Sequence, residues 1–186
     1  MTNWRIIDLV ADDRDAVTQT ASLLFAGFKT HWANAWPSLT DALAEVKLSL
    51  GEDRISRIAI DEQHQVLGWI GGMSQYDGNV WELHPLVVRS DWQKQGIGTA
   101  LVTDLEAQVK QRGGITLWVG TDDEDGMTSL GNIDLYPNVF EHIANIKNLH
   151  AHPYEFYQKM GFVIVGVMPD ANGWGKPDIY MAKRVK

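Results

Sequence analysis

The sequence predicts a single mixed α/β domain, residues 1–186, in which helices flank a central sheet. Short β-branched, apolar runs alternate with amphipathic helix patterns along the chain, which is typical of a layered α/β fold. Neither a linker nor a low-complexity tract interrupts them, and 186 residues with 45% hydrophobic residues suit one domain with a sizeable core.

The first part of the chain predicts two helices followed by a hairpin. Apolar residues recur every three or four positions in two segments, and Ser38 or Thr40 can cap the second of them. Two β-branched runs then flank a polar turn, the pattern of a β-hairpin. The expected elements are helices over 15–29 and 40–50 and strands over 57–60 and 66–73.

The next strand, over 80–88, contains the pair His84-Pro85 near its middle. Because proline cannot donate to a sheet ladder, we expect a bulge or a splayed strand at this point. Either one leaves nearby backbone groups free to bind another molecule.

The second half of the chain predicts strand–helix units and closing strands. Apolar residues at intervals of four predict a helix of about fifteen residues that begins near Ile97. A long acidic excursion over 121–148 follows the next strand. The expected elements are strands over 115–120, 162–167 and 179–185 and helices over 139–146 and 153–160.

Composition excludes several classes of function. The chain has no cysteine, so disulfides, thiolate metal sites and a cysteine acyl-enzyme are ruled out, and no histidine spacing predicts a metal site. A net charge of −8 disfavours nucleic acid and anionic membranes as partners but suits a small polycationic substrate. No apolar run is long enough to span a membrane and residues 1–15 lack a signal-peptide pattern, so we expect a cytoplasmic protein.

The segment Gln93-Lys94-Gln95-Gly96-Ile97-Gly98 follows a strand and opens a helix. Glycines there allow a tight turn, and the exposed N–H groups of a helix start attract phosphate. The dinucleotide fingerprint and the NTPase loop both fail, since a third glycine and a Gly-Lys-Ser/Thr sequence are absent. A phosphate-binding turn and a turn of purely structural use are both open on this motif alone.

Two separated motifs resemble those of GCN5-related N-acetyltransferases (GNAT). Gln93-x-x-Gly96-x-Gly98 matches the first signature of that superfamily, and Phe156-Tyr157-x-Lys159-x-Gly161-Phe162 matches the second. The resemblance implies the GNAT fold, an α/β sheet splayed at a mid-strand bulge, and acetyl-CoA as cosubstrate. Further segments are similar to aminoglycoside 6′-N-acetyltransferases: Trp81–Val88, Gly113–Thr116, Gly120–Asp123, His152–Tyr157 and Asn172–Asp178.

This resemblance implies a role for each matched residue. Backbone groups of the turn would hold the pyrophosphate of acetyl-CoA, and the strand after the bulge would bind the pantetheine arm. The implied coenzyme-binding residues are Leu86, Val87, Val88, Gln93, Lys94, Gln95, Gly96, Ile97, Gly98 and Thr99. Glu82 and His84, which share one face of the strand, would act on the acceptor amine, and the phenol of Tyr157 would assist departure of the CoA sulfur.

An aminoglycoside carries several ammonium groups, so we expect an acidic, partly aromatic acceptor site. Its expected residues are Trp32, Glu82, Asp122, Asp123, Asp170 and Asp178. The resemblance also implies a homodimer and a role in antibiotic resistance. The coenzyme motif does not identify the acceptor, so a polyamine, an amino sugar or a peptide amine stays an alternative, as does a non-catalytic acyl-CoA-binding domain. The joint presence of Glu82 and Tyr157 counts against the last.

Overall fold

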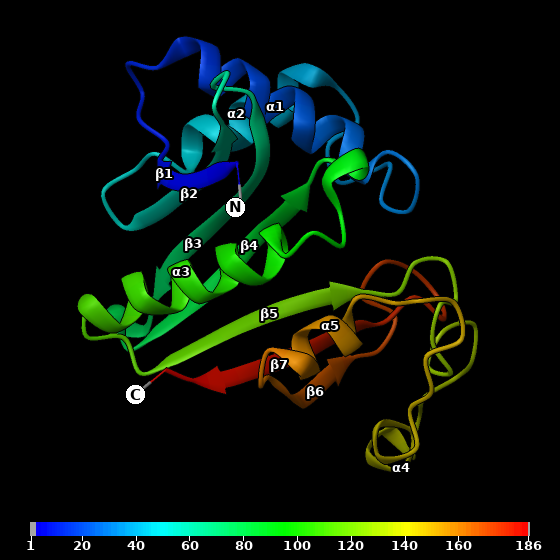
Figure 1. Ribbon diagram of the computed structural model, residues 1–186. Coiled ribbons are helices and arrows are strands. Elements are labelled where there is room, and N and C mark those ends of the chain that lie inside the picture. Colours follow the sequence, from blue (N-terminus) through cyan, green and yellow to red (C-terminus); the bar gives the residue numbers. More distant parts are fainter. Residues whose placement is uncertain (1–2, 186) are drawn as a thin grey trace. The chain divides into compact units, whose positions relative to one another are not determined.

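Four antiparallel strands and three long helices make up the first of two units in the computed structural model, which describes residues 3–185 (Figure 1). This unit contains the residues up to Leu117 together with Val185, and the second unit is Trp118–Arg184. The strands pair in the order β1-β2-β3-β4. The elements of the first unit are β1 (Trp4–Asp8), α1 (Arg14–Phe28), α2 (Leu39–Leu48), β2 (Arg54–Asp61), β3 (Val66–Gln75), β4 (Val80–Val88) and α3 (Ile97–Gln111), with 3₁₀ turns at Tyr76–Gly78 and Ser90–Trp92.

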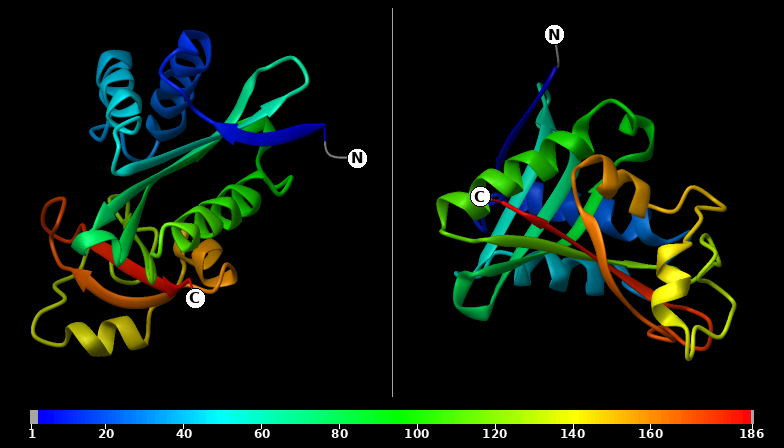
Figure 2. Two further views of the ribbon diagram at one scale, coloured as in Figure 1. Left: turned by 90° about the vertical axis from the view of Figure 1, so that its left-hand side faces the viewer. Right: turned by 90° about the horizontal axis from the view of Figure 1, so that it is seen from below.

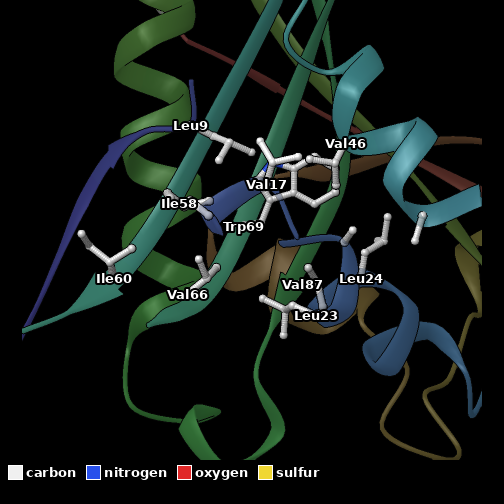
Figure 3. Close-up of a cluster of buried hydrophobic side chains, with 13 residues drawn as sticks. Leu9, Val17, Leu23, Leu24, Val46, Ile58, Ile60, Val66, Trp69 and Val87 are labelled. Atoms are coloured by element: carbon white, nitrogen blue, oxygen red, sulfur yellow. The ribbon is translucent and has the colours of Figure 1, made fainter. Parts of the chain in front are cut away.

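The helices of the first unit cover the two faces of its sheet, with α1 and α2 on one face and α3 on the other (Figure 2). On the α1–α2 face the fully buried indole of Trp69 lies in an apolar cluster with Val17, Leu24 and Val46 (Figure 3). Its Nε1 donates to the Ser56 hydroxyl at 2.9 Å, so the buried N–H is satisfied.

Glycines let α3 approach the opposite face of β3. A Cβ at Gly68 would lie 3.0 Å from Leu101, and one at Gly72 would lie 2.8 Å from Leu105. Arg57 of β2 also binds the helix, because its Nε donates to Asp104 of α3 at 2.7 Å while another of its nitrogens contacts Asp8 of β1. Packing and one guanidinium therefore fix α3 against the strands.

The second unit is built on three strands in the order β5-β7-β6. β6 and β7 are antiparallel, and β5 continues into this unit from the end of the first. Two short helices and long loops complete it. The elements are β5 (Thr116–Asp122), α4 (Val139–Ala144), α5 (Tyr154–Lys159), β6 (Val163–Met168) and β7 (Asp178–Arg184).

A bulge interrupts the pairing of β3 with β4. Ile70 pairs with Leu86 but Gly72 pairs with Leu83, so two residues of β4, His84 and Pro85, oppose one residue of β3. Residues directly opposite in a sheet share a face, and the extra residue therefore changes the alternation along β4. This change brings Glu82, opposite Met73, and Val87, opposite Trp69, to the same face as α1 and α2.

The predicted α/β class and the bulge at His84-Pro85 are confirmed, and each predicted helix and strand is found within a few residues of its expected bounds. The sequence pattern missed β1, a five-residue strand paired along its whole length with β2. Within residues 3–185, no helix combines the length and the apolar character that a membrane crossing requires.

The bulge predicts a specific intolerance at Gly71. A Cβ there would lie 2.2 Å from the carbonyl oxygen of His84, a backbone atom that cannot rotate away. We expect Gly71→Ala to lower the free energy of unfolding by about 1–3 kcal/mol in urea titrations, as overpacked sites do. Gly51→Ala is the matched control, because its Cβ would meet only ordinary contacts at 3.5 Å and beyond. Equal stability of the two variants would contradict the close approach.

Candidate functional site

Glu82 is a half-buried carboxylate on the α1–α2 face of the first unit. The side-chain nitrogen of Gln75 donates to its Oε2 at 2.7 Å. Burial raises the pKa of Glu82, and the nearby His84, the hydrogen bond from Gln75 and the charge of Arg54 oppose that rise. A carboxylate whose pKa is raised in this way is a stronger base than an exposed glutamate.

His84 shares this face with Glu82, as the sequence predicted. Its imidazole, with 38% of the side chain exposed, lies 5.7 Å from the ring of Trp36, and its Nε2 is 3.9 Å from an oxygen of Glu45 on α2. Trp36 and Trp32 both pack against Phe28, at 4.7 and 5.5 Å between ring centroids. The sequence had singled out neither Glu45 nor its contact with His84, because nothing local in the chain links the two.

The turn that precedes α3 and the first residues of this helix together contain the residues predicted to hold a phosphate. Lys94 and Gly96 adopt positive φ, +60° and +87°, and α3 begins directly afterwards. A Cβ on Gly96 would meet nothing within 4 Å, so its backbone conformation, and not a lack of space, favours glycine there. The side chains of Gln93 and Gln95 fold back onto the carbonyls of Val88 and Asp91, each at 3.2 Å.

The start of α3 offers backbone donors to a bound anion. Its N-cap residue is Gly96, whose lack of a side chain precludes capping, and its first turn contains no acidic residue. The N–H groups of Ile97, Gly98 and Thr99 come before the first intrahelical bond, which Ala100 donates to Gly96. Three successive donors and the positive end of the helix dipole favour the binding of an anion such as phosphate.

The residues predicted for the pantetheine arm lie at the end of β4, just before this turn. Leu86 and Val88 are partly exposed, whereas the side chain of Val87 is buried against α1. A Cβ on Gly27 of α1 would collide with Val87. Val87 can therefore contact a ligand through its backbone only.

Tyr157 lies in the second unit, on α5, and is 6% exposed. Its ring packs between those of Phe156 and Phe162, at 5.2 and 5.6 Å. Burial raises the pKa of Tyr157 well above its usual range. The phenol is therefore protonated at neutral pH and able to donate.

Asp123 does not have the position expected of a substrate ligand. It is fully buried, and its carboxylate accepts from the N–H groups of Met127 and Thr128 and from the Thr128 hydroxyl, at 2.6–2.8 Å. This carboxylate anchors the acidic loop from within, so the prediction that it contacts the acceptor is corrected.

Three more of the predicted aspartates, Asp122, Asp170 and Asp178, also belong to the second unit. Asp122 accepts from the side chain of Asn172 at 2.5 Å, and Asp170 accepts from the N–H of Gly175 at 2.7 Å. Asp178 is half-buried on β7, where a Cβ on Gly120 would lie 2.8 Å from its carboxylate. Asp122 and Asp170 thus hold the two loops in shape.

His152 is a buried histidine for which the sequence predicted no role in a site. Its Nδ1 accepts from the N–H of Tyr154 at 3.2 Å, so the ring proton lies on Nε2, 3.1 Å from the carbonyl oxygen of Asp122. Burial lowers the pKa of His152, which keeps the ring neutral. The neutral ring ties the start of α5 to the end of β5.

No group of three or more histidine, aspartate or glutamate side chains within residues 3–185 could hold a metal ion. The features that the two units do contain are a helix start with free donors and a basic carboxylate beside a strand bulge. Together with a protonated buried tyrosine, they are characteristic of the acyl-coenzyme-dependent transferases that the sequence motifs had indicated.

Comparison with known proteins identifies the family. The model of the Acetyltransferase (GNAT) family matches residues 22–131, more than half of the chain, and the chain therefore belongs to this family. A search of curated protein sequences returned no match.

Solved structures agree closely with this chain over nearly its whole length. The crystal structure of an aminoglycoside 6′-N-acetyltransferase complexed with coenzyme A is 42% identical, with 98% of this chain and 97% of that chain covered and a TM-score of 0.89. The aminoglycoside 6′-N-acetyltransferase from Enterococcus faecium is also 42% identical, with the same coverage and a TM-score of 0.87. An aminoglycoside 6′-acetyltransferase type Ii is 37% identical, with a TM-score of 0.74 over the same shares.

The role of Asp123 as a loop anchor predicts a loss of stability in Asp123→Asn. In this variant an NH₂ group replaces one of the accepting carboxylate oxygens and faces an N–H or O–H donor. That donor is then left without a partner, and an unsatisfied buried group costs about 1–3 kcal/mol. We expect thermal unfolding at a correspondingly lower temperature. Asp134→Asn is the control, because Asp134 is exposed and its single bond to the Tyr136 N–H can be kept by the amide oxygen. A wild-type melting temperature for Asp123→Asn would refute the anchor.

Proposed function

We propose that this chain transfers the acetyl group of acetyl-CoA to the 6′-amine of aminoglycoside antibiotics, directly and within a ternary complex. The observation that carries the proposal is 42% identity, over 98% of this chain, to an aminoglycoside 6′-N-acetyltransferase complexed with coenzyme A. The amine nitrogen forms a bond to the acetyl carbon, the carbon–sulfur bond breaks, and the sulfur takes up a proton. No metal takes part in this scheme.

The start of α3 is the proposed pyrophosphate site. The backbone donors of residues 95–99 would bind the phosphate oxygens, and the exposed Lys94 would add a positive charge beside them. The backbone of Leu86–Val88, which directly follows the bulge at His84-Pro85, would bind the pantetheine arm and polarise the thioester carbonyl.

An acidic side chain at this helix start should separate coenzyme binding from stability. Thr99 is exposed in the first turn of α3, where the helix dipole stabilises a glutamate but the glutamate repels a bound phosphate. We expect Thr99→Glu to weaken CoA binding about tenfold in calorimetry, without lowering the melting temperature.

The matched control for this variant is Thr103→Glu, which places the same charge one turn further along the exposed side of α3. Its CoA affinity should stay close to that of the wild type. If the two variants bind CoA equally well, the phosphates are bound elsewhere.

Glu82 is the proposed base or anchor for the acceptor amine, acting directly or through one water, and His84 would line the same face. The amine must lose a proton before or during attack on the thioester. A half-buried carboxylate with a raised pKa is suited to accept it. In the second unit, Tyr157 would donate its phenolic hydrogen bond to the departing sulfur.

The raised pKa of Glu82 predicts the pH dependence of kcat/KM. Activity that needs the ionised carboxylate falls toward acid, and because this pKa is raised, the fall begins at a higher pH than an exposed glutamate would give. We expect Glu82→Gln to lower kcat/KM on the order of 100-fold at neutral pH and to abolish this acid limb. Glu62→Gln, which changes an exposed glutamate of the same unit, should retain the wild-type profile. An acid limb that persists in Glu82→Gln would assign the base to another group.

The acceptor assignment is supported by charge. The chain carries a net charge of −8, and a multiply charged aminoglycoside gains from partly desolvated carboxylates such as Glu82. Asp122, Asp170, Asp178 and the indole of Trp32 are the further residues proposed to contact it.

The decisive experiment measures CoA thiol release with kanamycin or tobramycin as acceptor, against spermidine and a lysine peptide. We expect the two antibiotics to give a kcat/KM well above that of the other amines. Comparable values would make another amine the substrate and leave the family assignment intact.

Three further features belong to this proposal. Both units would form one acetyltransferase domain, since the family match over residues 22–131 includes residues of each. The enzyme would act in the cytoplasm, conferring resistance by modifying the antibiotic. It would do so as a homodimer, which light scattering can test.

A further inference from the structure

Glu45 of α2 approaches His84 on the α1–α2 face of the first unit. Its Oε1 lies 3.9 Å from Nε2 of His84, and only 22% of its side chain is exposed. This separation suits an ion pair with a protonated imidazole or a single bridging water with a neutral one. Neither the family motifs nor the sequence pattern involve this glutamate.

The imidazole of His84 is also held on a second side. Trp36 contacts it at 5.7 Å with the ring planes inclined by 48°, and Trp36 itself meets Phe28 edge-on at 4.7 Å. Phe28 and Trp36 belong to the periphery of the buried cluster beneath α1 and α2. The packed aromatic restrains the ring plane, and the carboxylate then determines which nitrogen points toward α2.

We propose that Glu45 is a positioning residue that acts through His84: it keeps the ring proton on Nε2 and so leaves Nδ1 to accept a hydrogen bond from an amino group of the acceptor. This inference rests on the proposed acetyl transfer. In a neutral imidazole one nitrogen donates and the other accepts, and the partner of the first decides the role of the second. The negative charge of the Glu45 carboxylate, 3.9 Å from Nε2, favours an N–H over a bare lone pair at that nitrogen, so Glu45 stabilises the tautomer protonated on Nε2.

Glu45→Gln removes this preference with little change of shape. The amide can accept from Nε2–H through its oxygen or donate to a bare Nε2 through its NH₂, so both tautomers become possible. The matched control is Glu52→Gln, the same exchange at an exposed glutamate in the turn after α2.

The first measurement needs no activity. In ¹⁵N NMR spectra of the neutral imidazoles, the His84 signals are those missing from His84→Phe. We expect wild type and Glu52→Gln to show the proton on Nε2 and Glu45→Gln to show a mixture. A wild-type ring protonated on Nδ1, or the same tautomer in Glu45→Gln as in wild type, would overturn the proposal.

The second measurement is a double-mutant cycle on acetyl transfer. We expect Glu45→Gln to lower kcat about three- to fivefold, the fold-change of a modest charge contact, with the KM for acetyl-CoA unchanged. In a His84→Phe background the same exchange should have no further effect. An equal loss in both backgrounds would show that Glu45 acts without His84 and refute the inference. If the wild type acetylates no aminoglycoside, the proposed function fails, while the NMR result still decides the role of Glu45.

Discussion

The close approach of the His84 carbonyl to Gly71 is the constraint on which the arrangement of side chains on the α1–α2 face of β4 depends. Because Gly71 has no side chain, β4 can accommodate two residues opposite one and still keep its pairing with β3 on both sides of the bulge. Val87 can then pack in the core beside Trp69, while the half-buried carboxylate of Glu82 lies on the same face of the sheet. A regular strand would turn one of these two side chains to the opposite face. The bulge therefore allows Val87 to pack in the core and Glu82 to lie on the face proposed to bind the acceptor amine.

Burial acts differently on the ionisable groups of the two units. At Glu82 burial is partial and raises the pKa, and His84, Gln75 and Arg54 oppose that rise. At Tyr157 no neighbouring group opposes the effect of burial, so the pKa of the phenol rises and it keeps its proton. Asp123 is buried as deeply, but three donors satisfy it, which makes it a structural group. Burial therefore has a different consequence for each of these groups, according to the partners that surround it.

Much of the fold and the location of the turn could be predicted from the sequence, because helical periodicity, β-branched runs and Gly96 are local signals. The strand β1 escaped because five residues at a sheet edge have too short a pattern. The site was less predictable. A motif shows that Glu82 and His84 share a face, but it cannot show that Glu45 on a separate helix reaches the imidazole, or that Asp123 is enclosed by its own loop. Such contacts arise from tertiary packing, which residue spacing does not encode.

The three long helices of the first unit start in two different ways, and the difference supports the proposed phosphate site at the start of α3. Asp13 caps α1 and Ser38 caps α2 with their own side chains, and each first turn also contains an acidic residue. The start of α3 has neither, and glycine in place of a capping side chain costs roughly a few tenths of a kcal/mol. Buried Ile97, Leu101 and Leu105, with Asp104 bound to Arg57, stabilise this helix by other means. Because α3 does not depend on a cap of its own, its first donors can remain available to a ligand.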